Sequence, residues 1–235
     1  MEASSREPLV LVPGLLCSPA LFAPQVAAFS GRRNVIVADH TRAERVEDIA
    51  GQILAEAPDR FALAGLSMGG YIVFEMLRQS PERVARVAFL DTSARPDTPE
   101  RTADRRKLIE VARKEGVRKV QAMLLPRLIH TDRLSQRDLR ETVLGMADAT
   151  GLEAFIREQE AIISRPDSRP GLAGISCPTL VLAGEQDLQT PPDIAREIAD
   201  GISGSRLAVI PDCGHLSTLE RPAAVNAALA DWLEA

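Results

Sequence analysis

The sequence predicts an α/β fold with a mostly parallel, doubly wound sheet, and three observations favour it. Short, wholly apolar segments alternate with longer amphipathic ones, and each strand-to-strand passage is long enough for a helix. One strand runs into a glycine-rich turn, Gly65-Leu66-Ser67-Met68-Gly69-Gly70, and a helical pattern follows at once. Between Ser93 and Gly174 the rhythm changes, and only helical patterns appear.

Composition describes an ordinary globular chain. Its 235 residues, 45% of them hydrophobic, suit one large domain, and a net charge of −5 argues against nucleic acids or anionic membranes as partners. The apolar stretch Leu9 to Val12 stops at Pro13, so we expect neither a signal peptide nor a membrane span, and a cytoplasmic location. Cys17, Cys177 and Cys213 are far apart and predict three free, buried thiols.

The first part of the chain alternates strands and helices in order. The strands are apolar without alternation, which is typical of strands buried on both faces, whereas the helices repeat apolar residues at helical spacing. Strands are predicted at Leu9 to Val12, Asn34 to Ala38, Phe61 to Ala64 and Val84 to Leu90, and helices at Ser18 to Phe29, Arg42 to Ala57 and Tyr71 to Gln79.

A helical layer is inserted at 94–174, between a first core segment at 1–93 and a second at 175–235. Its predicted helices are Pro99 to Glu115, Val117 to Leu125, Asp138 to Ala147 and Leu152 to Ile163. The second core segment has strand patterns at Pro178 to Ala183 and Leu207 to Ile210, and helices at Pro192 to Ile202 and Ala223 to Leu233.

The turn around Ser67 predicts a nucleophile. Glycines at 65 and 69 remove the side chains that would collide when a strand doubles back into a helix, so the serine is held at the tip of a strained turn. The alternative is a serine that only caps the helix.

A serine hydroxyl needs a base, and the base needs an orienting group. His215 follows the last strand and completes the chain order serine, acid, histidine; His40 and His130 are rivals. Asp187 follows the strand at Pro178 to Ala183 and is the favoured acid, with Glu185 and Asp91 as weaker candidates.

Two backbone N–H groups should receive the negative charge that develops on the substrate oxygen. One is that of Met68, directly after the nucleophile, and the other is that of Leu15, in the loop that Gly14 permits after the first strand.

These motifs together resemble the α/β-hydrolase superfamily with an inserted helical cap. The resemblance rests on Leu9 to Leu15, Gly65 to Gly70, Gly184 to Asp187, and Gly214-His215 followed by Glu220-Arg221-Pro222. It is closest to small bacterial hydrolases grouped with 3-oxoadipate enol-lactonases and carrier-protein methyl esterases. It implies a Ser67, His215, Asp187 triad, an oxyanion hole from Leu15 and Met68, and hydrolysis through an acyl-enzyme with no cofactor and no metal.

Three departures from the superfamily pattern stand out. The first strand begins close to the start of the chain, so the opening antiparallel pair of strands is expected to be missing or reduced. Pro13 stands where many members have histidine, and Asp39 is followed by His40-Thr41-Arg42 in place of a glycine-rich turn.

The helical insert gives hypotheses about the substrate. Met123, Leu124, Leu125 and Leu128 would line a pocket, although their spacing equally fits core packing. Between Arg95 and Lys119, nine Lys or Arg face five Asp or Glu, which predicts either a solvated helix or attraction of an anionic ester or an acidic carrier protein.

The sequence therefore predicts an esterase-type hydrolase for a small carboxylic ester, lactone or thioester. Within the same triad, C–C bond hydrolysis, perhydrolysis and lyase chemistry stay open. A non-catalytic ligand receptor on the same fold is the alternative from another class, and the oligomeric state is not predicted.

Overall fold

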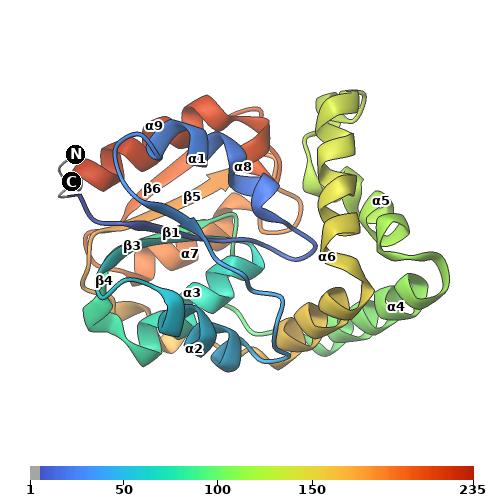
Figure 1. Ribbon diagram of the computed structural model, residues 1–235, viewed down its shortest axis with the longest axis horizontal. Coiled ribbons are helices and arrows are strands. Elements are labelled where there is room, and N and C mark those ends of the chain that lie inside the picture. The colour runs from blue at the N-terminus through green and yellow to red at the C-terminus, as the bar shows by residue number, and fades with distance from the viewer. Residues whose placement is uncertain (1–5) are drawn as a thin grey trace.

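The computed structural model describes residues 6–235 and has one six-stranded sheet in which all paired strands are parallel (Figure 1). The strand order is β2-β1-β3-β4-β5-β6. The strands are β1 (Leu9–Val12), β2 (Val35–Val37), β3 (Phe61–Leu66), β4 (Val84–Leu90), β5 (Thr179–Gly184) and β6 (Arg206–Ile210). Within these residues the sheet has no antiparallel strand, as the sequence predicts.

Helices cover both faces of this sheet (Figure 1). One face carries α1 (Ala23–Phe29), α8 (Ser217–Glu220) and α9 (Pro222–Glu234), and the other carries α2 (Val46–Glu56), α3 (Met68–Gln79) and α7 (Pro192–Gly201). Strand side chains alternate between the two layers: Leu9 and Leu11 pack with the α9 side, whereas Val10 and Val12 pack with the α2 and α3 side. The apolar residues of the strands therefore fill two cores, one on each face of the sheet.

The remaining helices lie together beyond one end of the sheet (Figure 1). They are α4 (Pro99–Glu115), α5 (Val117–Leu128) and α6 (Arg137–Ser164). The two helices expected between 138 and 163 run on as α6, but Gly151 interrupts it with φ 77° and ψ 172°. The non-helical glycine is the reason that the sequence pattern reads as two segments.

The structure differs from the sequence prediction mostly at element ends. The residues of β2 are only half-buried, because β2 is an edge strand with a single neighbour. The helix expected from Ser18 begins as a short 3-10 turn, Pro19–Phe22, before α1, and the four-residue α8 was not predicted.

The strand order places the loop after β1 beside the turn after β3. Chain connections leave β1 in one direction to β2 and later continue on its other side with β3, so β1 and β3 flank the switch point of the sheet. A Cβ on Gly14 would lie 3.2 Å from the Cβ of Ser67, which shows how closely the two loops approach. In open parallel sheets this crevice is where ligands bind.

Candidate active site

The turn at Ser67 is strained and closely packed. Ser67 has φ 55° and ψ −116°, a conformation that non-glycine residues rarely adopt. A Cβ on Gly69 would overlap the carbonyl oxygen of Val12, and one on Gly70 would overlap the side chain of Thr92. The Ser67 N–H donates to Leu90 O at 3.0 Å, and its carbonyl accepts from Thr92 Oγ1 at 2.7 Å. The hydrogen bonds with Leu90 and Thr92 fix the backbone of Ser67 on both sides of its side chain.

The structure brings Ser67, His215 and Asp187 together in a hydrogen-bonded chain. His215 Nε2 lies 2.9 Å from Ser67 Oγ, and His215 Nδ1 lies 2.7 Å from Asp187 Oδ2. Because a carboxylate accepts, Nδ1 carries the hydrogen and Nε2 is free to accept from the serine hydroxyl. His215 and Asp187 are almost wholly buried.

Asp187 is held by its own loop. Its Oδ1 accepts from the backbone N–H groups of Gln189 at 2.7 Å and Thr190 at 3.0 Å, and its Oδ2 accepts from Thr190 Oγ1 at 2.7 Å. Burial disfavours the charged carboxylate, but the charge of His215 and these hydrogen bonds outweigh it and lower the pKa of Asp187. The carboxylate is therefore fixed in place and ionised.

The pKa of His215 is shifted upward, whereas that of Asp187 is shifted downward. Burial alone would lower its pKa, but the charge of Asp187 and its hydrogen bond prevail and raise the pKa above the ordinary histidine value. A buried base that is stabilised when it gains a proton suits proton transfer from a hydroxyl.

None of the rival residues takes part in the hydrogen-bonded chain from Ser67 through His215 to Asp187. Asp91 is buried and accepts from Gly184 N–H and Ser217 Oγ; burial, with the charge of Asp187, raises its pKa to about 8. Glu185 is exposed, and His130 accepts from the N–H of Asp132 through Nδ1 at 3.2 Å. His40 is buried behind the loop that follows β1.

The two backbone N–H groups singled out from the sequence flank the serine. Met68 is the first residue of α3, so its N–H has no partner within the helix. In the part of the chain that the structure describes, neither this N–H nor that of Leu15 donates a hydrogen bond to another protein atom. Both donors remain available to a ligand atom at Ser67.

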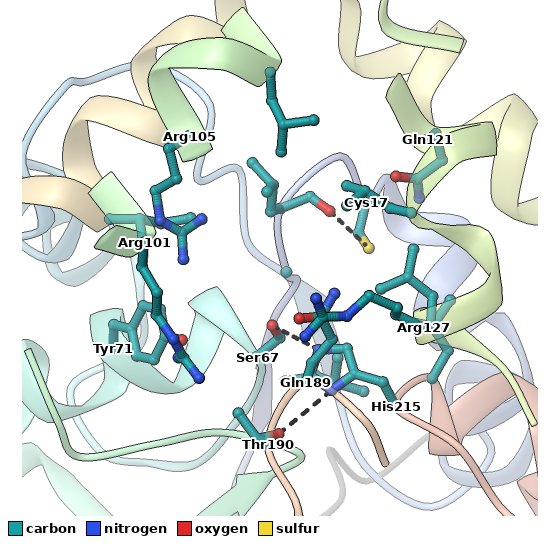
Figure 2. A pocket seen from close by; sticks show the side chains of 18 of the residues that line it. Cys17, Ser67, Tyr71, Arg101, Arg105, Gln121, Arg127, Gln189, Thr190 and His215 are labelled. Atoms are coloured by element: carbon teal, nitrogen blue, oxygen red, sulfur yellow. Dashed lines mark hydrogen bonds between the residues drawn. The ribbon is translucent and has the colours of Figure 1, made fainter. Parts of the chain in front are cut away.

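A cavity of about 190 Å³ opens over Ser67 (Figure 2). Leu124 and Leu128 line it together with Leu15 and Ser67. Met123 does not line it: its side chain is 50% exposed, because adjacent helical residues point about 100° apart and Leu124 takes the inward position. Leu125 packs into the core on the α9 side of the sheet.

Sequence reasoning missed most of the polar lining of this cavity. Besides Ser67 and His215, the polar lining residues are Tyr71, Arg101, Asp104, Arg105, Gln121, Arg127, Gln189 and Thr190. In Figure 2, Arg101 and Arg105 extend from one side of the cavity and Arg127 from the other. Arg101 and Arg105 lie in the charge-rich segment already noted, whereas Arg127 gave no signal as an isolated charge near a helix end.

These arginines differ in their partners. Arg105 pairs with Asp97 at 3.1 Å, and its Nη1 donates to Gln159 Oε1 at 3.0 Å. Arg127 Nη2 donates only to the carbonyl of Leu188 at 3.2 Å. Among residues 6–235 no carboxylate lies within ion-pair distance of Arg101 or Arg127, and the one acidic lining residue, Asp104, pairs with Lys107 at 2.8 Å.

The helical layer is joined to the loop that carries His215. The carbonyl of Leu128, the last residue of α5, accepts from the backbone N–H of His215 at 3.1 Å and of Leu216 at 3.0 Å. The Glu220 carboxylate bridges the two parts as well, accepting from the N–H of Gly214 at 3.0 Å and of His130 at 2.7 Å.

The three cysteines are free thiols. Burial raises the pKa of Cys17, with a further contribution from Glu158, and burial likewise raises the pKa of Cys213. Neither is a competing nucleophile, because a thiol must ionise to attack. No helix in residues 6–235 has the length and apolar character needed to span a membrane.

Comparison with known proteins agrees with this fold. The sequence profile of the alpha/beta hydrolase family matches residues 9–228. A thermophilic esterase from Thermogutta terrifontis, solved with malate bound, superposes with a TM-score of 0.89 at 29% identity, covering 99% of this chain and 91% of that one. The enol-lactonase from Burkholderia xenovorans LB400 also gives 0.89 at 29% identity, covering 98% and 92%. The 2-hydroxy-6-oxononadienedioate/2-hydroxy-6-oxononatrienedioate hydrolase of Escherichia coli is 27% identical over 196 residues, which are 79% of this chain and 68% of that protein.

Proposed function

Because the chain belongs to the alpha/beta hydrolase family, we propose that it is a serine hydrolase that cleaves a small carboxylic ester, lactone or thioester through an acyl-enzyme. The observation that carries the proposal is the chain of hydrogen bonds from Ser67 Oγ through His215 to Asp187, with links of 2.9 and 2.7 Å. Two of the similar solved structures are an esterase and an enol-lactonase, which supports the choice of bond.

The proposed reaction begins with attack of Ser67 Oγ on the substrate carbonyl carbon. His215 Nε2 takes the hydroxyl proton as the C–O bond forms, and Asp187 stabilises the imidazolium. Collapse of the tetrahedral intermediate returns this proton to the leaving alkoxide or thiolate and leaves an acyl-Ser67 ester. Water, deprotonated by the same imidazole, then releases the carboxylic acid and regenerates the serine.

The oxyanion of each tetrahedral intermediate is proposed to bind the N–H groups of Leu15 and Met68. Both lie beside Ser67 without an acceptor in residues 6–235, so no existing hydrogen bond must break when charge develops. Preformed donors of this kind each contribute about 2.7–4 kcal/mol to the transition state in other hydrolases.

We further propose that the substrate carries a carboxylate near the scissile bond. Arg101 and Arg127 reach the cavity from opposite sides without a carboxylate partner in the described chain, and a guanidinium is a good partner for a carboxylate. Leu124 and Leu128 would contact an aliphatic part of the same molecule. The alternative of an acidic carrier protein places its charge outside the cavity.

The test uses p-nitrophenyl esters, lactones and acyl thioesters in pairs with and without a carboxylate, assayed with wild type and Ser67→Ala. Ser67→Ala should lose turnover by about 10⁴-fold or more while keeping its thermal midpoint, because only the nucleophile is removed. Tyr71→Phe, which also alters the cavity wall but leaves the triad intact, should keep activity within about tenfold.

Product analysis and a fluorophosphonate probe separate the alternatives. Rapid labelling of Ser67 with ester turnover supports the hydrolase, whereas tight ligand binding with an unmodified serine would favour a receptor. Full esterase activity in Ser67→Ala would refute the mechanism.

A further inference from the structure

Two buried ionisable side chains outside the proposed triad lie against the loop Gly14-Leu15-Leu16. Glu158, from the second half of α6, has no exposed surface, and His40, from the loop after β2, is 2% exposed. Burying a carboxylate and an imidazole is costly unless they have partners. Each has a hydrogen-bond partner in the backbone of this loop, and the two side chains approach one another closely.

The contacts of His40 fix the peptide unit between Gly14 and Leu15. His40 Nε2 lies 3.1 Å from Gly14 O, and since a carbonyl oxygen only accepts, Nε2 carries the hydrogen. In a planar trans peptide the C=O and the following N–H point in opposite directions. A hydrogen bond that holds Gly14 O on the buried side therefore directs the Leu15 N–H away from it, toward the cavity side that Leu15 lines.

Glu158 fixes the next peptide unit. Its Oε2 accepts from the Leu16 N–H at 3.0 Å, and its Oε1 lies 2.9 Å from His40 Nε2. Leu16 has φ 55°, a conformation that a leucine adopts only when its surroundings hold it there. The peptide between Leu15 and Leu16 is thus held by Glu158. The peptide between Gly14 and Leu15 is held by His40 together with the Cys17 N–H, which also donates to Gly14 O at 3.1 Å.

We infer that Glu158 and His40 are positioning residues that hold the Leu15 N–H in the geometry of the oxyanion hole. This inference rests on the proposed function. It assigns a role to the sequence His40-Thr41-Arg42, which departs from the glycine-rich turn of the superfamily. It also makes α6 of the helical layer part of the floor of the site, because Glu158 reaches the loop after β1 from outside the sheet.

The matched variants are Glu158→Leu, Glu158→Gln, His40→Phe and, as control, Arg157→Gln. Leucine removes the acceptor of the Leu16 N–H at similar size, whereas glutamine keeps one. Arg157 Nε donates to Thr41 O at 2.8 Å, so it ties the same helix to the same loop without touching residues 14–16. A role limited to docking α6 would make Arg157→Gln and Glu158→Leu alike.

The readouts are kcat and KM for a neutral p-nitrophenyl ester, the rate of fluorophosphonate labelling of Ser67, and the thermal midpoint. Glu158→Leu and His40→Phe should lower kcat and the labelling rate about 10- to 100-fold with KM within about twofold, because only a transition-state donor is displaced. Glu158→Gln should recover to within about fivefold of wild type, and Arg157→Gln should match wild type.

Three results would overturn the inference: kcat and labelling unchanged in Glu158→Leu and His40→Phe, a loss in Arg157→Gln equal to that in Glu158→Leu, or no recovery with glutamine. If Glu158→Leu fails to fold, His40→Phe and Glu158→Gln still decide. A wild-type protein that neither labels nor turns over any ester would instead refute the proposed function, independently of these variants.

Discussion

The proposed proton acceptor of the site, His215, is an imidazole whose pKa is raised chiefly by Asp187, with smaller contributions from the charges of Asp91 and Glu220. Burial opposes the charged form of His215, and the charge and hydrogen bond of Asp187 overcome that opposition. Proton abstraction from Ser67 needs neutral His215. A raised pKa therefore moves the acid limb of the pH profile to higher pH, and the proposed activity should rise with pH through a value above the ordinary histidine pKa of about 6.5.

Asp187→Asn should lower kcat by about 10⁴-fold, the loss seen when the equivalent group is replaced in serine proteases, because the tautomer that frees Nε2 is no longer favoured. Its residual activity should have an acid limb at lower pH than wild type, since burial remains and the largest compensating charge is gone, leaving only those of Asp91 and Glu220. The measurement is kcat/KM against pH. Glu185→Gln, an exposed carboxylate in the same loop, is the control and should leave rate and limb unchanged. An unmoved limb in Asp187→Asn would contradict the assigned coupling.

Site residues that follow strands could be predicted from the sequence, whereas Glu158, which lies within a helix, could not. Ser67, Asp187 and His215 each follow a strand, so parallel-sheet geometry brings them to one edge, and the structure does place them within hydrogen-bond distance. Glu158 stands in a helix among other charges and has the pattern of a solvated surface residue. Only the kink at Gly151 and the packing of α6 turn it toward the loop after β1, and neither can be derived from periodicity.

At the scale of elements, the junction between β3 and α3 depends on glycine for space. A Cβ on Gly69 would overlap Val12 O, and Val12 belongs to the neighbouring strand β1, so the added methyl group would push the two loops of the site apart. Backbone atoms at this distance cannot rotate away as a side chain can. The geometry of the turn is therefore specified by the adjacent strand as well as by its own residues.

Gly69→Ala should lower the free energy of unfolding by about 2 kcal/mol or more, and with it the thermal midpoint, and it should abolish esterase activity. Gly145→Ala is the matched control: it lies in α6 with nothing within 4 Å of the added Cβ, and it should be neutral or stabilising by up to about 1 kcal/mol. Thermal unfolding of both variants measures this. Equal stability of the two would mean that the close approach at Gly69 is relieved without cost.

The elements themselves were predictable to within a few residues, because fully apolar strands and periodic helices have distinct signatures. The neighbours against which these elements pack were less predictable. The segment at Val35–Val37 reads as buried although it forms an edge, since a sequence does not state how many neighbours a strand has. In α5, the same limit led to Met123 being predicted beside Leu124 in the cavity, whereas only Leu124 of the two lines it, because helical phase is fixed only by the surface against which the helix packs.

Across the whole molecule, charge is distributed unevenly. The chain carries a net charge of −5, yet Arg101, Arg105 and Arg127 gather at the cavity. Most other cations of the segment 95–119 are paired on the surface, among them Arg95 with Glu197 and Arg113 with Glu110. The sequence predicted the local excess of positive charge. Because most of these cations are paired on the surface, the proposed attraction for an anion is assigned to the arginines that line the cavity.

Arg127→Gln should lower kcat/KM for a carboxylated ester by about tenfold and leave its neutral analogue within about twofold, because one guanidinium partner is lost. Raising the ionic strength should weaken the wild-type preference and affect the variant less. Lys114→Gln removes the same charge from an exposed position of α4 outside the cavity and should change neither rate by more than about twofold. Equal salt dependence for charged and neutral esters would remove the carboxylate from the proposal.

The hydrogen bonds from the main chain of His215 and Leu216 to Leu128 O limit how a reactant can enter. A hinged lifting of α5 would pull on the backbone of His215, the proposed general base, so opening this roof is expected to disturb the proposed proton transfer beneath it. Entry must instead pass a rim whose frame stays fixed and whose width is set by rotamers such as that of Arg127. Substituting smaller residues at the rim should then allow bulkier substrates to enter. Loosening the attachment of α5 should instead lower turnover before it broadens the range of substrates.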